Sequence, residues 1–181
     1  TLEHIDDDTL GVSVRVSTVW LAHLPALSRI ASRAFATSVT TLHSLTLVGA
    51  NRLPLSEVLS LVNSPLRALR TLSLSLADGQ HSIPKRAFSG ELTRLQRIQF
   101  VRHHYRVLSI GSRAIASLTA LEHFDLSGIT ILEIEVDAFV TEQATSKTLY
   151  LNLSNCDLDE TKLRNQPFDG TKRPIELDLS K

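Results

Sequence analysis

The sequence predicts an α/β solenoid in which each copy of a repeated unit adds one strand to a continuous parallel sheet. The first observation is a period, since a segment of the form apolar-x-x-apolar-x-apolar recurs every 26 or 27 residues. The second is alternation within each segment, which is typical of a strand with one buried face. The third is a small residue followed by a large apolar residue in the second half of each repeat.

The repeated segments predict seven parallel strands. Their first residues are Val16, Leu42, Leu69, Leu95, Leu121, Thr148 and Pro174. The fourth and sixth residues of each segment are apolar, as in LHSLTL from Leu42 and LRTLSL from Leu69. We therefore expect these two positions to face the core in every repeat.

The return segment of each repeat carries the small-large pair. The pairs are Ala34-Phe35, Ser60-Leu61, Ala87-Phe88, Ala114-Ile115, Ala138-Phe139 and Pro167-Phe168. This pattern predicts a short helix or turn on the outer side, whose large side chain reaches inward to close the core. Neighbouring repeats then bury a core that no single repeat could bury.

The repeats define one domain over residues 16–181, with about seven repeats, the last of them truncated after its strand. Residues 1–15 fit the period poorly. We interpret them as an N-terminal edge element or a degenerate repeat.

Composition narrows the classes of function. The 181 residues are 43% hydrophobic and carry 19 basic and 19 acidic side chains, so there is no net field to attract nucleic acid. No run of 18 apolar residues is present, and no membrane span is expected. The single cysteine excludes an internal disulfide and leaves the compartment open.

Several segments resemble leucine-rich repeats. These are LHSLTLVGANRL, LRTLSL with IPKRAFSG, LEHFDLSGITIL, and TLYLNLSNCDL with PFDG. The resemblance covers about residues 16–181. The chain resembles the extracellular class of these repeats more than the ribonuclease-inhibitor class. The irregular repeats also resemble secreted arthropod leucine-rich-repeat proteins, such as the non-catalytic subunit of a shrimp luciferase. The resemblance implies a curved parallel sheet on the concave side, with short helices, turns and irregular loops on the convex side.

The chain departs from the family pattern in two respects. The Asn that follows the strand in the family is largely replaced, since the aligned positions hold Leu24, Ala50, Ala77, His103, Ile129 and Cys156. We expect water or backbone partners to satisfy the turn there. Cysteine-rich caps are absent at both ends, which predicts either a longer native chain or another chain over the open edge.

In repeats of this family the third, fifth and seventh template positions face the concave side. The densest run of long polar side chains at these positions is Arg97, Gln99, His123, Asp125, Tyr150 and Asn152. We take these as the candidate binding residues, for a polar or basic protein segment or a glycan. The alternative is a solvated face whose Ser and Thr residues serve strand formation and solubility.

Trp20 adds a seventh candidate, because exposed tryptophan is a common anchor in interfaces. The alternative, which the sequence favours, is that it packs beneath residues 1–15. Asn152-Leu153-Ser154 is a possible glycosylation sequon in mid-strand. The sequence favours chance occurrence of this sequon over its use as a glycosylation site.

Other clusters have simpler explanations. His103-His104-Tyr105-Arg106 predicts a polar loop rather than a metal site, and Asp6-Asp7-Asp8 lacks the spacing of a calcium loop. The ladder Asp125, Asn152, Asp178 could bridge a cation but is also explained by exposure. Cys156 is predicted to be a buried structural thiol. No metal and no cofactor are expected.

The function predicted is therefore non-enzymatic: no GxSxG, P-loop, HExxH or GxGxxG pattern is present. The first hypothesis is a secreted module that recognises a protein or glycan. The second is a structural or assembly subunit that docks another chain through its uncapped ends or convex loops, as a homo- or hetero-oligomer. An extracellular location follows from the resemblance, with a cytoplasmic one as the alternative.

Overall fold

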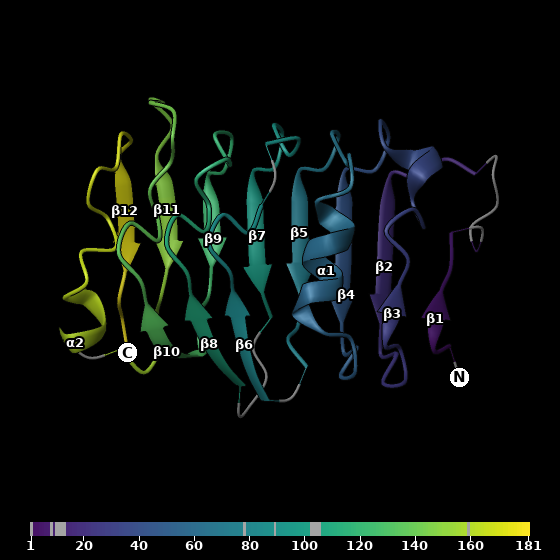
Figure 1. The fold of residues 1–181 in the computed structure, drawn as a ribbon, viewed down its shortest axis with the longest axis horizontal. Helices are drawn as coiled ribbons and strands as arrows, with labels where there is room; N and C mark the ends of the chain where they lie inside the picture. The colour runs from purple at the N-terminus through teal and green to yellow at the C-terminus, as the bar shows by residue number, and fades with distance from the viewer. Residues whose placement is uncertain are drawn as a thin grey trace.

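The computed structural model shows a parallel β-solenoid of about six turns with few helices. It describes residues 2–7, 9, 14–77, 79–88, 90–101, 106–158 and 160–181. The larger of its sheets has seven strands that stand side by side along the molecule, with the two termini at opposite ends (Figure 1). Among the described residues, no helix is long and apolar enough to cross a membrane.

The seven strands of the larger sheet lie at the seven predicted segments, in chain order. They are β2 (Thr18–Ala22), β4 (Ser44–Val48), β5 (Thr71–Leu74), β7 (Arg97–Phe100), β9 (His123–Asp125), β11 (Leu149–Asn152) and β12 (Ile175–Asp178). All neighbours pair in parallel, and the third positions of successive repeats lie in register. The predicted strands and their register are confirmed.

The fourth and sixth positions of the five central strands are buried, as predicted. At the two ends the pattern weakens, because a terminal strand has a neighbour on one side only. On β12, Leu177 and Leu179 occupy these positions and are 37% and 44% exposed. The core therefore remains uncovered at the β12 end of the solenoid.

The return segments form a second layer, in which β6 (Gly79–Ile83), β8 (Arg106–Ile110) and β10 (Thr130–Ile134) pair as a three-stranded parallel sheet. Helix α1 (Leu55–Val62) lies over β4 and β5 in the same layer (Figure 1). The remaining elements are the two-stranded sheet of β1 (His4–Ile5) and β3 (Arg29–Ile30), the 3-10 helix η1 (Ala36–Ser38) and helix α2 (Glu160–Leu163).

Three return segments keep a turn or bend at or next to the small-large pair, as expected, but each also contains a strand that the sequence analysis did not predict. There, strands form because the segments pair with one another and place Ile83, Ile110 and Ile134 in register, all buried. The inward role of the large residue of each small-large pair is confirmed. Phe35, Leu61, Phe88, Ile115 and Phe139 are buried, and Phe168 is partly buried against the same core.

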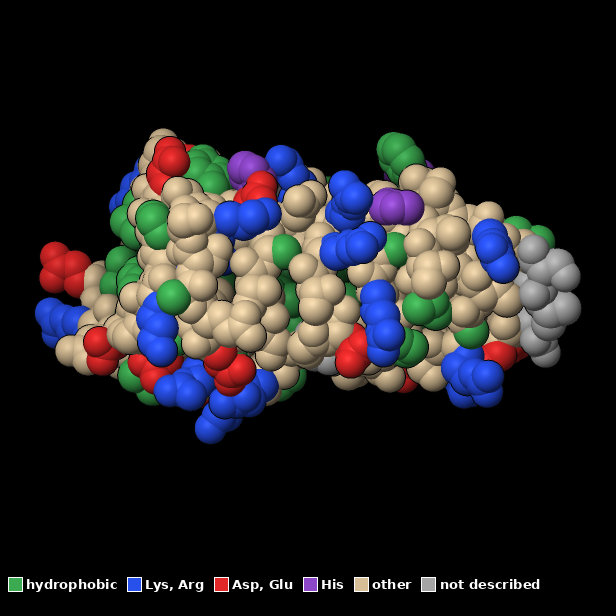
Figure 2. All heavy atoms as spheres, turned by 90° about the horizontal axis from the view of Figure 1, so that it is seen from above, with side chains coloured by type: hydrophobic (Ala, Val, Ile, Leu, Met, Phe, Trp, Pro, Cys, Tyr) green, Lys and Arg blue, Asp and Glu red, His purple; other side chains and the backbone are tan. Residues whose placement is uncertain are grey.

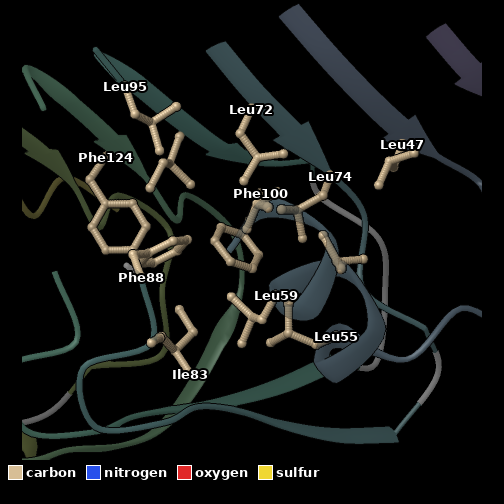
Figure 3. Packing of buried hydrophobic residues seen from close by; sticks show 14 of the residues in the cluster. Leu47, Leu55, Leu59, Leu72, Leu74, Ile83, Phe88, Leu95, Phe100 and Phe124 are labelled. Carbon is tan, nitrogen blue, oxygen red and sulfur yellow. The ribbon is translucent and has the colours of Figure 1, made fainter. Parts of the chain in front are cut away.

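The core lies between the two layers. Figure 3 shows side chains from the larger sheet, such as Leu72 and Phe124, facing Ile83, Phe88 and Leu59 from the return segments. Because apolar area removed from water is the main stabilising contribution, each repeat depends on its neighbours for stability.

Backbone pairs satisfy three of the strand exits, which is one of the two kinds of partner expected there. The amides of His23, Gly128 and Asn155 donate to the carbonyls of Val48, Ser154 and Ser180 in the next repeat, at 2.9, 2.8 and 2.7 Å. The three donors have positive φ, which aims the amide along the solenoid axis. At Gly49 the acceptor is the hydroxyl of Ser75, at 2.9 Å.

We expect Gly111→Ala to destabilise the protein by about 2 kcal/mol through overpacking. Gly111 follows β8, and a Cβ atom there would lie 2.7 Å from the backbone nitrogen of Lys85 and 2.9 Å from the carbonyl carbon of Pro84. Backbone atoms cannot move aside as a flexible side chain can. Urea denaturation measures the loss. Gly90→Ala, where a Cβ meets nothing within 4 Å, is the control, and equal losses in both variants would contradict this explanation.

Candidate binding site on the larger sheet

Six of the seven predicted site residues form one block on the outward face of the larger sheet. They come from three adjacent strands, β7, β9 and β11. Arg97 is in register with His123, and His123 with Tyr150; Gln99 is likewise in register with Asp125, and Asp125 with Asn152. The structure therefore brings these six together as two rows of three.

An aromatic pair lies at the centre of the first row. The rings of His123 and Tyr150 meet edge to face, with centroids 5.9 Å apart. The hydroxyl of Tyr150 donates to Oδ2 of Asp178 on β12 at 3.2 Å. The site thus extends to a fourth strand through Asp178, which the sequence analysis considered in a possible cation ladder but did not include among the binding residues.

The second row is fixed by turns at the strand exits. Oδ1 of Asp125, Asn152 and Asp178 accepts the backbone amide of Ser127, Ser154 and Ser180, at 2.9, 3.0 and 2.9 Å. Each is a turn in which a short polar side chain binds the amide two residues later. This accounts for the recurrence of Asp-Leu-Ser and Asn-Leu-Ser, and it gives the predicted acidic ladder a structural role.

Desolvation, nearby charge and hydrogen bonds shift the pKa values of Tyr150, in the first row, and of Asp178, which extends the second row. The pKa of Tyr150 is raised, first by loss of solvation and then by the negative charge of Asp178. The pKa of Asp178 is lowered, because the amide and hydroxyl of Ser180 and the phenol of Tyr150 donate to its charged form. At neutral pH the β11–β12 end of the face therefore presents a neutral phenol beside an ionised carboxylate.

A hollow of about 330 Å³ opens where these strands begin. It is lined by Glu122, His123, Lys147, Thr148, Tyr150 and Glu176. Lys147 forms an ion pair with Glu122 and lowers the pKa of that carboxyl. Glu176 has no ion-pair partner in the part of the chain that the structure describes, so its carboxylate is available to a ligand.

Trp20 lies apart from this block. It is on β2, and β4 and β5 separate it from β7. Its side chain is 74% exposed, and residues 4–5 pair with β3 in another sheet rather than covering β2. Exposure favours the anchor interpretation over burial beneath residues 1–15.

Cys156 is buried, as predicted, and its thiol donates to the carbonyl of Leu126 at 3.1 Å. Burial raises its pKa, so the thiol is held in its neutral form. In the acidic segment near the N-terminus, Asp6 begins a turn closed by Thr9, and Oδ1 of Asp7 accepts the amide of Arg33 at 3.2 Å.

Two candidates lie wholly or partly outside the described residues. Of the cluster His103-His104-Tyr105-Arg106, the three residues 103–105 and the side chain of Arg106 are not described, and Asp8 is not described either. Among the described residues, no three His, Cys, Asp or Glu side chains are grouped so as to hold a metal ion.

The sequence reasoning missed Arg173, a buried basic residue. The residue is 6% exposed, and its guanidinium group donates to two backbone carbonyls, those of Leu121 and of Lys147. Arg173 immediately precedes the first position of the last repeat, outside the strand template. A pattern of strand positions therefore could not single it out.

We expect the Asp178→Asn variant to lose less stability in acid than the parent protein. Because the folded-state pKa of Asp178 is lowered, its ionised form adds stability above its ordinary pKa, and this is lost as pH falls below about 4. Unfolding free energies measured from neutral pH to pH 2 test this. Asn retains an acceptor for the Ser180 amide, whereas Asp178→Ala removes it and should be less stable at every pH. If the free energy of unfolding falls equally between neutral pH and pH 2 in Asp178→Asn and in the parent, the prediction is refuted.

Comparison with known proteins adds no relative: no family model matches the chain, and neither a curated protein nor a solved structure gives a significant match.

Proposed function

We propose that this protein is a non-enzymatic recognition module of the leucine-rich-repeat type, whose sheet face at β7, β9 and β11 is concave and binds an extended basic segment of another protein. The observation that supports this most directly is the two-row block of Arg97, His123, Tyr150, Gln99, Asp125 and Asn152. Every strand that carries it is hydrogen-bonded on both sides. A rigid face presents side chains at low entropic cost to binding.

Charge and shape favour a basic segment. Beyond Arg97, the face carries Asp125, Glu176 and Asp178, and the hollow between β9 and β12 has His123 and Tyr150 in its wall. An aromatic ring flanked by carboxylates suits a Lys or Arg side chain, through cation–π and ionic contacts together. The strand-end turns hold Asp125 and Asp178 in place before a partner arrives.

The test uses immobilised protein and extended peptides that alternate Lys or Arg with small residues, matched to Glu-containing peptides of the same length. The double variant Tyr150→Ala/Glu176→Gln should weaken binding of the basic peptides about tenfold or more, in the range of interface hot spots. Thr46→Ala/Ser73→Ala, on β4 and β5 of the same face, is the matched control. Equal binding of basic and acidic peptides, or equal loss in both variants, overturns the proposal.

The proposed compartment is extracellular, and the sequon bears on the site itself. Asn152 lies within the block and its Oδ1 is engaged by Ser154. A glycan on Asn152 would cover β9, β11 and β12. The mass of the protein from a secreting cell therefore tests both the compartment and the site. A glycan on Asn152 in every molecule would support secretion and would exclude this face as a protein-binding site.

A specific observation also favours the second function, assembly through the solenoid end. Among the described residues, β12 pairs only with β11 and is an edge strand, and Leu177 and Leu179 are exposed where a following repeat would bury them. Such an edge is a template for another strand. Light scattering at micromolar concentration tests it: assembly should be lost in Leu177→Lys/Leu179→Lys, and a monomeric parent protein would exclude self-assembly through this end.

A further inference from the structure

A second hollow lies near the starts of β5, β7 and β9, in the middle of the larger sheet. Its volume is about 270 Å³, and its lining residues are Arg70, Thr93, Arg94, Gln96, Ala120 and Lys147. Three of the six carry positive charge, and none is acidic. Figure 2 looks onto the edge of the molecule where the strands of the larger sheet begin and shows Lys and Arg side chains spread along it.

The positive charges are only partly neutralised. Lys147 pairs with Glu122. Arg70 and Arg94 form no ion pair within the described residues. The whole chain has no net charge, so this positive density results from charge segregation rather than from a basic composition. Like charges held around one hollow repel each other, which is unfavourable unless an anion binds between them.

The backbone that carries these side chains is fixed. The carbonyl of Arg70 accepts the amides of Gln96 and Arg97 at 2.9 and 3.0 Å, and the carbonyl of Gln96 accepts the amide of Glu122 at 2.8 Å. The cations thus project from three repeats that are tied together at this edge. A site formed in this way needs little backbone ordering when an anion arrives.

We propose that this hollow binds a sulfate group of a sulfated polysaccharide chain. Guanidinium groups match the geometry of oxyanions, and Arg70 and Arg94 would supply them, with Lys147 as a point charge. The adjoining sheet face suits the remainder of a sugar, since Thr71, Ser73 and Gln99 present hydroxyl and amide groups on β5 and β7. No aromatic residue lines the hollow, so the stacking platform that single-stranded nucleic acids require is missing there.

The inference can be tested separately from the basic-segment site of the preceding section, because Arg70 and Arg94, which supply its guanidinium groups, are not part of that site. Lys147 and Gln99 border both sites. The test measures binding of a heparin oligosaccharide and of the same oligosaccharide after removal of its sulfates. Arg70→Gln/Arg94→Gln should weaken heparin binding about tenfold and lower its salt dependence by about two charges. Arg52→Gln/Arg164→Gln, which removes two exposed cations elsewhere, should change affinity less than about twofold.

All four mutated side chains are exposed, and unchanged thermal unfolding will confirm that each variant folds. The Tyr150→Ala/Glu176→Gln variant should retain heparin binding, which separates this inference from the function proposed above. Three outcomes overturn it: equal binding of the desulfated chain, equal loss in the control variant, or equally tight binding of polyglutamate or single-stranded DNA. The last outcome would indicate a general polyanion surface.

Discussion

Phe124→Ala should lower the free energy of unfolding by about 3–5 kcal/mol, the usual cost of truncating a buried phenylalanine. Phe124 is fully buried on β9. Its ring centroid lies 6.2 Å from that of Phe100 and 6.2 Å from that of Phe139. Phe139 in turn stacks on Phe168 at 5.3 Å. Truncation would therefore open a cavity at the centre of an aromatic row that joins successive repeats.

Urea denaturation followed by circular dichroism measures this loss. Leu132→Ala on β10 is the control, because that side chain is 52% exposed, and it should cost less than about 1 kcal/mol. A broadened transition for Phe124→Ala would indicate that the repeats on either side of the cavity unfold separately, as one-dimensional stacks can. A loss below about 1 kcal/mol would show that the aromatic row does not support the core.

Arg173→Ala should cost about 3 kcal/mol and should weaken the last repeats selectively. Arg173 donates from Nε to the carbonyl of Lys147 at 3.1 Å and from a terminal nitrogen to the carbonyl of Leu121. Those carbonyls precede β11 and β9. Hydrogen bonds from charged groups each contribute about 1.5–3 kcal/mol, and desolvation of the guanidinium, which also lowers the pKa of Arg173, offsets part of that gain.

Hydrogen exchange resolves where stability is lost. Amides of β9, β11 and β12 should exchange faster in Arg173→Ala, while those of β2, β4 and β5 should be unchanged. Lys172→Ala, an exposed neighbour of the same charge, is the matched control. Uniform acceleration across all strands would contradict a local role for Arg173, and no acceleration would mean that water replaces its hydrogen bonds without loss.

The candidate site was largely predictable because strand positions alternate. Once the repeat was found, the third and fifth residues of each segment had to share a face, and parallel pairing at a constant period placed Arg97, His123 and Tyr150 side by side. The turns that fix Asp125 and Asp178 were not predicted. They depend on an acceptor meeting an amide two residues later, which in turn depends on the local φ and ψ.

The sequence by itself determined the period, the seven strands of the larger sheet, their register and the inward side chains. All of these follow from the spacing of apolar residues. Only the tertiary structure decided the return layer, because β6, β8 and β10 form through pairing between repeats rather than from a strong local pattern. It also decided the buried position of Arg173 and the gathering of Arg70, Arg94 and Lys147 around one hollow. Such groupings join residues distant in the chain, and their positions are set by how the repeats stack.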